Sequence, residues 1–514
     1  MNDRPRAESV PPTEAPDDRV VVIDESHEIA WSRLGLLVDQ LATALAEHGV
    51  GRGDRVAVAM PNRLEWIVAN LALGRLGATQ VALNARLTPP EAAYIARDSG
   101  AVLALIDVQD GEAMTEALRG AGVRSVVVLD EPVPAGAIPW PEPVRSAPAR
   151  CWAPADETPL VVYTSGTTGK PKGALRDTSR VDPETLACYT ASVGYDDAPP
   201  FAPRERRVLL NMPLHHASGP QQVAATLRSH GLLVLQRRFD AEDTLRLIAE
   251  HRLTDWTAVP TMLTRVLGLP EHVRRRHDLT SLRRVVTVGA PCPPTLKQAF
   301  SKVFGPDLLF EGYGCTETSM IAGLRPWEHA ARPGSAGRPF RHVQVRVLTG
   351  DGRPAAAGTT GEIWARTPRV IAAYLGRGPL PADVLDTDGF FRTGDLGHLD
   401  QDGYLYITGR SSDLIISGGV NIYPAEIENH LRTHPEVRDV AVIGVPDEEM
   451  GERVLAVVEP RPGAHLTAEE LLSHRPDALA AYKRPRAVHF MAELPRNSLG
   501  KVLKHQLTSS AWHE

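Results

Sequence analysis

The chain has 514 residues, with 56 lysines and arginines against 63 aspartates and glutamates, so its formal net charge is −7. This weakly acidic balance argues against a nucleic-acid binder, and 42 glycines with 43 prolines are too few for a wholly disordered chain. The four cysteines form no CxxC pair, which argues against a disulfide framework and a thiolate zinc site. We therefore expect a cytoplasmic protein whose cysteines stay reduced.

The N-terminal residues 1–18 are polar and proline-rich and lack the apolar segment of a signal peptide. We expect them to form a disordered tail. The sequence contains no run of about 18 apolar residues, so no membrane span is predicted.

Helices alternate with short apolar strands through the first part of the chain. Apolar residues spaced by three and four predict helices over Trp31–Glu47 and Arg63–Leu76. The expected strands are Arg55–Met60, Val102–Ile106, Ser125–Leu129, Leu160–Tyr163, Val208–Met212, Leu232–Leu235 and Arg284–Val288, with a further helix from Ala241. This alternation is typical of βαβ units around a parallel sheet. The proline-rich stretch Pro132–Pro159 is expected to be a surface connection.

The pattern changes after Gly358. Short strands separated by turns are predicted at Gly361–Ala365, Gly403–Thr408 and Asp413–Ser417. A helix is expected to begin near Pro424, whose ring suits a first helical turn. From Val437 the expected order is strand, strand, helix (Ala468–Ala480) and strand. The sequence therefore indicates a small α+β domain behind a large α/β domain.

The most informative segment is Tyr163–Gly173, of sequence YTSGTTGKPKG, which directly follows a predicted strand. Its backbone N–H groups and hydroxyls can surround phosphate oxygens, and its two lysines add positive charge. It is not a P-loop, because Gly166 and Gly169 are three residues apart instead of five and Pro171 stands where that motif has Ser or Thr. It predicts a phosphate-binding loop of another kind.

This loop resembles the signature of the adenylate-forming superfamily, which comprises acyl-CoA synthetases, adenylation domains and luciferases. Matching motifs follow in the family's order at Tyr313-Gly-Cys-Thr-Glu-Thr318, Gly361-Glu-Ile363, Thr393-Gly-Asp395, Gly409-Arg410 with Asp413, Ser417-Gly-Gly419 and Pro495-Arg-Asn-Ser-Leu-Gly-Lys501. The resemblance implies an α/β fold. Its large N-terminal adenylate-forming domain of stacked sheets and helices would span residues 1–411, and a small mobile α+β domain would span residues 412–514.

The resemblance also implies how ATP and Mg²⁺ bind. The β- and γ-phosphates would be held by Thr164, Ser165, Gly166, Thr167, Thr168, Gly169, Lys170 and Lys172. Glu317 would bind Mg²⁺, and Thr316 would contact the α-phosphate. Asp395 would accept hydrogen bonds from both ribose hydroxyls, assisted by Arg410. The adenine would be flanked by Gly289, Ala290 and Pro291 on one side and by Glu311, Gly312 and Tyr313 on the other.

Two further residues receive catalytic roles from the resemblance. Lys501 would reach the carboxylate and the α-phosphate during adenylation, a role for a point charge. His216 corresponds to a family histidine that lines and gates the acyl site, with its neighbour His215 as the alternative. The walls of the acyl pocket are expected around His216–Gln221, Gly289–Pro291 and Gly312–Cys315.

The second step of the reaction needs an acceptor thiol. The resemblance implies that the small domain rotates about a hinge near Ser412 and withdraws Lys501. This rotation would bring Ser417, Gly418 and Gly419 into a tunnel for the pantetheine arm of CoA.

The sequence departs from the family pattern in two places. Ser412 stands where the hinge residue is usually Asp or Lys. The segment Ala174–Ser179 replaces the common hydrophobic-Thr-His start of a helix after the phosphate loop. This second variant resembles ligases that act on bulky, steroid-like or polycyclic acids.

The resulting prediction is an acid–CoA ligase that uses ATP, Mg²⁺ and coenzyme A. Three alternatives stay open: a stand-alone adenylation enzyme that loads a separate carrier protein, a ligase specialised in one half-reaction, and a catalytically silent nucleotide-binding protein. The expected partners are a small-molecule carboxylic acid, ATP and CoA, with no nucleic acid and no membrane span. The oligomeric state is open, with a homodimer as one option.

Overall fold

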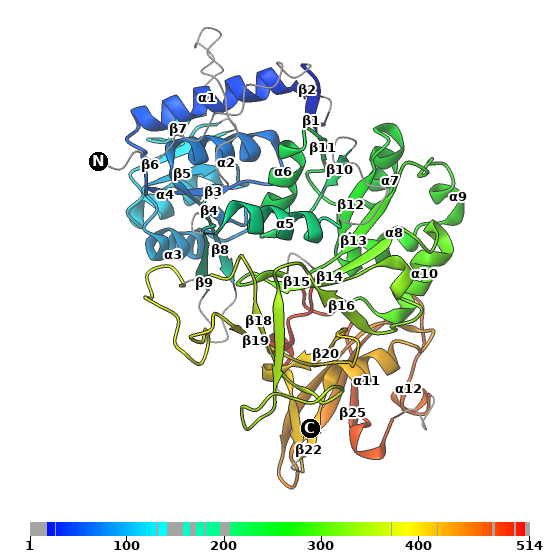
Figure 1. The fold of residues 1–514 in the computed structure, drawn as a ribbon. Coiled ribbons are helices and arrows are strands. Elements are labelled where there is room, and N and C mark those ends of the chain that lie inside the picture. The colour runs from blue at the N-terminus through cyan, green and yellow to red at the C-terminus, as the bar shows by residue number, and fades with distance from the viewer. Residues whose placement is uncertain are drawn as a thin grey trace.

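The computed structural model describes residues 18–25, 27–129, 132–140, 158–164, 171–178, 181–195, 206–371, 373–418, 420–474, 479–497 and 500–508. The predicted tail, apart from Asp18, lies outside these residues. Figure 1 shows a large unit that holds the N-terminal and central parts of the chain, with a smaller C-terminal unit below it. Within the described ranges, no helix is both long enough and apolar enough to cross a bilayer.

The first sheet of the large unit has seven strands in the order β7-β6-β5-β3-β4-β8-β9. Their bounds are β3 Arg55–Ala59, β4 Thr79–Leu83, β5 Leu103–Ile106, β6 Ser125–Val128, β7 Ile138–Pro139, β8 Leu160–Thr164 and β9 Lys172–Arg176. All neighbours are parallel except β8 and β9. The connecting helices are α2 Leu64–Leu76, α3 Pro89–Ser99 and α4 Gly111–Gly120. This part has the βαβ order that the sequence predicted.

One detail of the first sheet differs from the sequence prediction. The stretch Pro132–Pro159 is not only a surface connection, because Ile138–Pro139 pairs with β6 as an edge strand. A proline is accepted there because an edge strand leaves one row of N–H positions unused. Residues 141–157 of this stretch lie outside the described part.

The second sheet has thirteen strands in the order β17-β18-β19-β20-β16-β15-β14-β13-β12-β10-β11-β1-β2. Their bounds are β1 Val20–Asp24, β2 His27–Ala30, β10 Arg207–Leu210, β11 Leu232–Leu235, β12 Asp255–Ala258, β13 Arg284–Thr287, β14 Leu309–Cys315, β15 Ser319–Leu324, β16 Ser335–Pro339, β17 Gln344–Leu348, β18 Gly361–Arg366, β19 Phe391–Leu399 and β20 Leu405–Arg410. Neighbouring strands are parallel in the part of this order that runs β14-β13-β12-β10-β11-β1. They are antiparallel in the part that runs β17-β18-β19-β20-β16-β15-β14. The sheet is therefore mixed.

Helices cover and join the two sheets. They are α1 Trp31–Glu47, α5 Pro183–Val193, α6 Ser218–Arg228, α7 Ala241–Glu250, α8 Pro260–Leu267, α9 Glu271–Arg274 and α10 Pro294–Phe304. One buried cluster contains residues of α1, α2 and α6 together with residues of both sheets, among them Leu34, Trp66 and Leu227. Asn62 follows β3 of the first sheet, and Met212 follows β10 of the second sheet. The side-chain amide of Asn62 donates to the carbonyl of Met212 over 3.0 Å and so links the two sheets. The predicted stack of sheets and helices is confirmed.

The helix α5 was not expected from the sequence. Its only buried residues are Tyr189 and Ser192, so no apolar period of 3.6 residues marks it. The helix begins because the Asp182 side chain accepts a hydrogen bond from the Thr185 N–H and Pro183 occupies the first turn.

The C-terminal unit is built on a smaller sheet of order β22-β21-β24-β23, with β25 added beside β24. Its elements are β21 Ile415–Ser417, β22 Val420–Ile422, α11 Pro424–Leu431, β23 Val437–Asp447, β24 Gly451–Pro460, α12 Ala468–Leu472, β25 Ala487–Phe490 and α13 Lys504–Thr508. The predicted α+β composition is confirmed. The boundary at residues 411 and 412 stays a prediction.

The helix predicted over Ala468–Ala480 is wrong in its length. The structure has a capping box at Thr467 and Glu470, but the helix ends at Leu472. The sequence has Pro476 four residues later. Proline lacks an N–H group and disfavours the helical conformation of the residue before it, so the helix cannot continue through that position.

Candidate active site

A large cavity lies between the two sheets and reaches the C-terminal unit. Its volume of about 2480 Å³ exceeds the range of about 300–1,000 Å³ for a pocket that holds one small ligand. The helices α5 and α6 line one part, the turn from β14 to β15 lines another, and the segments around Arg410 and Lys501 close the C-terminal side. The cavity can therefore hold a nucleotide and a second substrate together.

Glu317 lies in the turn between β14 and β15, beside the end of β8. Its Oε1 lies 3.0 Å from the hydroxyl of Tyr374 and 3.5 Å from the hydroxyl of Thr164. Lys172 lies on the other side, with its Nζ 5.6 Å from the centre of the Tyr374 ring. Thr164, the first predicted phosphate-loop residue, thus meets the predicted metal ligand, and Lys172, the last, lies near the tyrosine that binds it. Ser165, Gly166, Thr167, Thr168, Gly169 and Lys170 lie outside the described part.

The single carboxylate of Glu317 fits Mg²⁺ better than it fits a metal ion that is held only by protein side chains. In the described residues, no group of three or more His, Cys, Asp and Glu side chains could hold a metal ion. Mg²⁺ is usually bound through one or two carboxylates together with substrate phosphates and water. A single carboxylate beside a phosphate loop fits that ligand set.

Two hydrogen bonds join the described ends of the phosphate loop to α3. The hydroxyl of Tyr94 on α3 donates to the carbonyl of Pro171 over 3.1 Å, and that of Tyr163 donates to Asp98 over 2.8 Å. Both bonds tie the described ends of the loop to one helix. This fixes the point at which the phosphate loop leaves and rejoins the sheet.

Asp395 is buried on β19, opposite Arg410 on β20. Arg410 Nε lies 2.9 Å from Asp395 Oδ1, and the hydroxyl of Tyr313 donates to Asp395 Oδ2 over 2.6 Å. The nearby carboxylate raises the pKa of Arg410. The structure therefore brings together three of the residues that the sequence assigned to nucleotide binding, with the Asp395 carboxylate accepting from its two neighbours.

The two segments predicted to flank the adenine are only partly at the cavity. Gly289 lines it, with φ of 84°, whereas Ala290 and Pro291 do not. On the other segment the lining begins at Gly314, beyond Glu311 and Gly312. The side chain of Glu311 forms an ion pair with Lys297, which is buried.

Lys501 enters the cavity from the C-terminal unit. Its loop is held by two hydrogen bonds with Asn497, each of 2.9 Å, and by the packing of Gly500 against Thr261 of α8. Burial lowers the pKa of Lys501 and nearby Arg410 lowers it further, whereas Asp395 raises it. The structure thus places this lysine beside the predicted ribose-binding residues, in the arrangement expected for adenylation.

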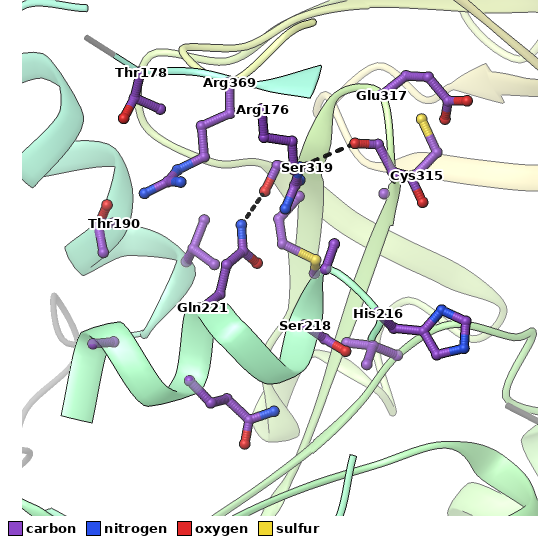
Figure 2. Close-up of a pocket in the computed structure, with 18 of the residues that line it drawn as sticks. Arg176, Thr178, Thr190, His216, Ser218, Gln221, Cys315, Glu317, Ser319 and Arg369 are labelled. Carbon is purple, nitrogen blue, oxygen red and sulfur yellow. Dashed lines mark hydrogen bonds between the residues drawn. The ribbon is translucent and has the colours of Figure 1, made fainter. Parts of the chain in front are cut away.

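The histidine pair after β10 differs in its access to the cavity. His216 lines it, and its ring centre lies 4.4 Å from that of His215. Burial lowers the pKa of His216 to about 4 and that of His215 to about 3. Both imidazoles are therefore neutral near pH 7. Figure 2 shows His216 beside Ser218 on the α6 side of the pocket.

The predicted hinge and tunnel residues lie in different places. Ser412 lines the cavity in a short 3₁₀ turn, where its hydroxyl donates to Asp413 over 3.0 Å. Ser417 and Gly418 belong to the β21–β22 hairpin and do not line the cavity. Gly418 has φ of 57°, and a Cβ there would lie 2.5 Å from the Met450 side chain. Gly419 lies outside the described residues.

Sequence reasoning missed three residues of this cavity. Tyr374 binds Glu317, Arg369 follows β18, and Thr190 lies on the unexpected helix α5. Arg176 was noted only as part of an unusual segment, yet its Nε donates to the carbonyl of Thr316 over 3.2 Å. The sequence did contain a signal for Arg176 as a cavity residue, because it belongs to the segment after the phosphate loop that departs from the family pattern.

Comparison with family models gives two consecutive matches. The model described as AMP-binding enzyme matches residues 11–375, and the model of the AMP-binding enzyme C-terminal domain matches residues 426–501. The chain belongs to the AMP-binding enzyme family. The predicted membership of the adenylate-forming superfamily is thereby confirmed.

Relatives of this AMP-binding enzyme are named as CoA ligases. An indoleacetate–CoA ligase from Aromatoleum aromaticum is 37% identical over 93% of this chain and 92% of its own length. A feruloyl-CoA synthase from Amycolatopsis is 36% identical, with 93% of each chain covered. A Mycobacterium tuberculosis ligase named for a methyl-dioxo-octahydro-indenyl propanoyl group is 34% identical, with 95% of each covered.

Solved structures agree with the fold of this AMP-binding enzyme. An amide bond synthetase from Marinactinospora thermotolerans has a TM-score of 0.83 at 31% identity, covering 95% of this chain and 96% of that one. The o-succinylbenzoate CoA synthetase of Bacillus subtilis, in complex with ATP and magnesium, has a TM-score of 0.79 at 32% identity, with 95% and 96% covered. The chain is therefore an adenylate-forming acid–CoA ligase that uses ATP, Mg²⁺ and CoA.

Proposed function

We propose that this ligase activates a bulky, ring-bearing carboxylic acid in the cavity between α5 and α6. The observation that carries the proposal is the convergence of Lys501, from the C-terminal unit, with Glu317 and Thr164, from the large unit, on one cavity. The positive charge of Lys501 and the negative charge of Glu317 thus lie at the place where Thr164, at the end of the phosphate loop, borders the part of the cavity that would hold the acid.

In the first half-reaction, a carboxylate oxygen of the acid attacks the α-phosphorus of ATP. The bond from that phosphorus to its bridging oxygen breaks, and pyrophosphate leaves with the bonding electrons. Negative charge builds on the phosphate oxygens in the transition state. Lys501 stabilises this charge at the α-phosphate, Thr316 donates a hydrogen bond there, and Lys172 binds the leaving pyrophosphate.

The remaining site residues hold the nucleotide. Asp395 binds the two ribose hydroxyls, and Arg410 orients the Asp395 carboxylate through its ion pair. Glu317 holds Mg²⁺, which when bound neutralises charge on the phosphate oxygens. Tyr374 fixes the direction of the Glu317 carboxylate through its hydroxyl. The half-buried, neutral His216 forms a wall between the nucleotide and the acid.

In the second half-reaction, the thiolate of CoA attacks the acyl carbon, and AMP leaves with the electrons of the acyl–oxygen bond. Lys501 fills part of the cavity in this structure, and Ser417 and Gly418 are away from it. A rotation near Ser412 would withdraw Lys501 from the cavity and bring Ser417 and Gly418 to it. The enzyme would then alternate between these two domain arrangements, one for each half-reaction. We propose CoA as the acceptor instead of a carrier protein, because the sequence relatives are named as CoA ligases.

A bulky acid is supported by the size of the cavity, by its lining from α5 and by the names of several relatives. The cavity is larger than a nucleotide site needs, and the α5 residues that line it include the small side chains of Ala187, Thr190 and Ala191 beside the larger Leu186 and Tyr189. Three of the relatives are named for indoleacetate, feruloyl and indenyl-propanoyl substrates, which carry rings, whereas two others are named for long-chain fatty acids and sulfoacetate. The cytoplasmic location and the homodimer stay predictions; light scattering of the purified protein measures the second.

The test is a panel of acids of increasing ring size, incubated with ATP and Mg²⁺ and with either CoA or a pantetheinylated carrier protein. We expect AMP release and a CoA thioester, identified by its mass, with ring-bearing acids preferred over linear acids of equal carbon number. A product found only on the carrier protein would establish the alternative adenylation enzyme. Acyl-AMP that accumulates with either acceptor would establish a ligase specialised in the first half-reaction.

A further inference from the structure

The turn that carries Lys501 contains a second basic residue, Arg496. Arg496 forms an antiparallel bridge with Val502 across the turn. The backbone N–H of Asn497 donates to the carbonyl of Lys501 over 2.9 Å, and the N–H of Gly500 donates to the carbonyl of Asn497 over 2.9 Å. Arg496 and Lys501 are therefore parts of one tight hairpin, and the position of Lys501 depends on what holds this hairpin.

The guanidinium of Arg496 binds the backbone of the hairpin directly before Lys501. Its Nη1 donates to the carbonyl of Gly500 over 3.2 Å. Gly500 has φ of 75°, a conformation that favours glycine, and a Cβ there would collide with the side chain of Thr261 on α8. The contact of Arg496 is thus made to the residue at which the hairpin touches the large unit.

The other terminal nitrogen of the same guanidinium is anchored in the C-terminal sheet. Arg496 Nη2 donates to Asp439 Oδ2 on β23 over 2.8 Å and to Glu459 Oε2 on β24 over 2.9 Å. Glu459 is only 1% exposed, and its Oε2 also accepts from the backbone N–H of Leu494 over 3.1 Å. Burial lowers the pKa of Arg496, but the two carboxylates raise it above its usual value. The charged Arg496 therefore joins the hairpin to two strands of the sheet.

Two further arginines bind the same carboxylates. Arg432 Nε lies 2.9 Å from Asp439 Oδ1, and Arg438 Nη1 lies 2.9 Å from Glu459 Oε1. The contacts that the structure describes for these two arginines lie within α11, β23 and β24. Three arginines therefore share two carboxylates, and among these three the described contacts with the hairpin belong to Arg496.

We propose that Arg496 is a positioning residue for adenylation, which holds the Lys501 hairpin at a fixed place on the C-terminal sheet through the carbonyl of Gly500. This inference rests on the proposed function, because it concerns the step in which Lys501 stabilises charge at the α-phosphate. A planar guanidinium suits the role, since one nitrogen can bind the carbonyl while another binds the carboxylates. A lysine in its place has a single nitrogen and cannot span both sets of partners.

The role belongs to the first half-reaction alone. Lys501 acts on the adenylation transition state and is withdrawn before CoA attacks, so a misplaced hairpin lowers kcat for adenylation and leaves the KM values largely unchanged. A displacement of about 1 Å can slow a reaction by roughly a hundredfold. Asp439, Glu459 and the hairpin all move with the C-terminal unit. Damage to the fold of that unit would therefore lower both half-reactions together.

The test uses Arg496→Lys in the full-length enzyme. This variant keeps a positive charge beside the buried Glu459, whereas a neutral residue would leave that carboxylate with one arginine fewer and destabilise the unit. Pyrophosphate exchange, with the acid that the wild type uses best in the panel, measures adenylation, and conversion of its synthetic acyl-AMP with CoA measures the second step. We expect kcat for exchange to fall by roughly tenfold or more, while the KM values and the second step change by less than about twofold.

A second measurement needs no acid substrate. Acetic anhydride modifies exposed lysine amines, and mass spectrometry reports the modified fraction of Lys501 with and without Mg²⁺ and α,β-methylene-ATP. We expect the nucleotide to protect Lys501 in the wild type and to protect it less in Arg496→Lys. The reason is that a displaced hairpin no longer holds the amine against the phosphates.

The matched controls are Arg438→Lys and Arg432→Lys. Each alters the pair with one of the same two carboxylates and leaves the contact between Arg496 and Gly500 in place. Both should keep pyrophosphate exchange and the protection of Lys501 within about twofold of the wild type. Melting temperatures of all three variants are measured alongside.

The outcomes separate this inference from the proposed function. Equal loss of both half-reactions in Arg496→Lys, an equal loss of exchange in the two controls, or no loss in any variant overturns the positioning role and leaves the ligase function intact. If the wild type activates no ring-bearing acid, the proposed function is wrong. In that case, protection of Lys501 that is lost in Arg496→Lys and kept in the controls supports the positioning role, and protection that is equal in all four proteins overturns it.

Discussion

The hydroxyl of Tyr313 donates a hydrogen bond to Asp395 Oδ2 over 2.6 Å, while Arg410 holds the other oxygen of the same carboxylate. Asp395 is only 5% exposed. A buried carboxylate stays ionised only when charge and hydrogen bonds compensate the loss of water. Each oxygen can accept more than one hydrogen bond, so Asp395 is oriented and still able to bind two hydroxyls.

We predict that Asp395→Ala raises the KM for ATP by roughly tenfold or more, because two hydrogen bonds to a charged acceptor are each worth about 1.5–3 kcal/mol. Steady-state kinetics at saturating acid measure the effect. Asp395→Asn is the comparison, since it keeps the shape and part of the acceptor capacity and should lose less. An unchanged KM for ATP in Asp395→Ala would refute the ribose assignment.

Tyr374→Phe tests the link between Tyr374 and Glu317. The variant removes one hydrogen bond of 3.0 Å to the carboxylate and leaves the ring in place. Groups that orient a metal ligand typically change metal affinity by roughly 10–100-fold when removed. We expect the Mg²⁺ concentration for half-maximal pyrophosphate exchange to rise by about tenfold.

The control for Tyr374→Phe is Tyr404→Phe, which removes a hydrogen bond of 2.8 Å to Glu328 outside the cavity. That variant should leave the Mg²⁺ dependence unchanged. If both variants shifted it equally, or if neither did, Tyr374 would have no positioning role.

Lys501→Ala should abolish formation of acyl-AMP from acid and ATP and leave the conversion of supplied acyl-AMP with CoA largely intact. The physical reason is that its charge acts on the adenylation transition state and is withdrawn before the second step. Each half-reaction is assayed separately. Lys483→Ala, which removes an ion pair with Glu426, serves as the control in the same unit. Equal loss of both half-reactions would contradict the role given to Lys501.

Ser412→Pro tests the hinge. Proline fixes φ near −65°, so it can suit only one of two domain arrangements. We expect adenylation to be kept and thioester formation to fall by roughly a hundredfold, the cost of misplaced catalytic groups. Ser412→Ala is the control, because it leaves φ free. Equal retention of both activities would move the hinge elsewhere, and equal loss with a lower melting temperature would indicate simple destabilisation.

His329 makes stability depend on pH. Burial and the nearby Lys297 lower its pKa to about 4, and its Nε2 lies 2.9 Å from the carbonyl of Leu309. An unfolded histidine has a pKa of about 6.5, so between these values the unfolded chain binds the extra proton. The contribution of His329 to the free energy of unfolding is therefore fully present above about pH 6.5 and is lost as the pH falls towards 4.

We expect His329→Gln to flatten this dependence, because glutamine keeps an amide donor for Leu309 and does not titrate. Denaturant unfolding of both proteins from about pH 7.5 to about pH 4.5 measures the difference. The gap in unfolding free energy between wild type and variant should shrink as the pH falls. Parallel curves over this range would contradict a lowered pKa at His329.

The amino-acid sequence by itself determined the family, the order of strands and helices in the large unit, and the segments that meet ATP. It could do so because these features are local. The pattern of neighbouring residues predicts a strand or an amphipathic helix, and a phosphate loop needs its hydroxyls, glycines and lysines close together in the chain. The placement of Thr164, Glu317 and Lys501 at one cavity agrees with what the motifs predicted.

Only the tertiary structure decided which side chains face the cavity from distant segments. Glu311 was expected at the adenine, yet it turns to Lys297, because successive side chains of a strand point to opposite faces. Helix α5 carries too few buried residues to show an apolar period, and its position comes from packing. Arg176 on β9 and Thr367 after β18 both donate hydrogen bonds to backbone carbonyls of the β14–β15 turn, a relation that no short stretch of sequence contains.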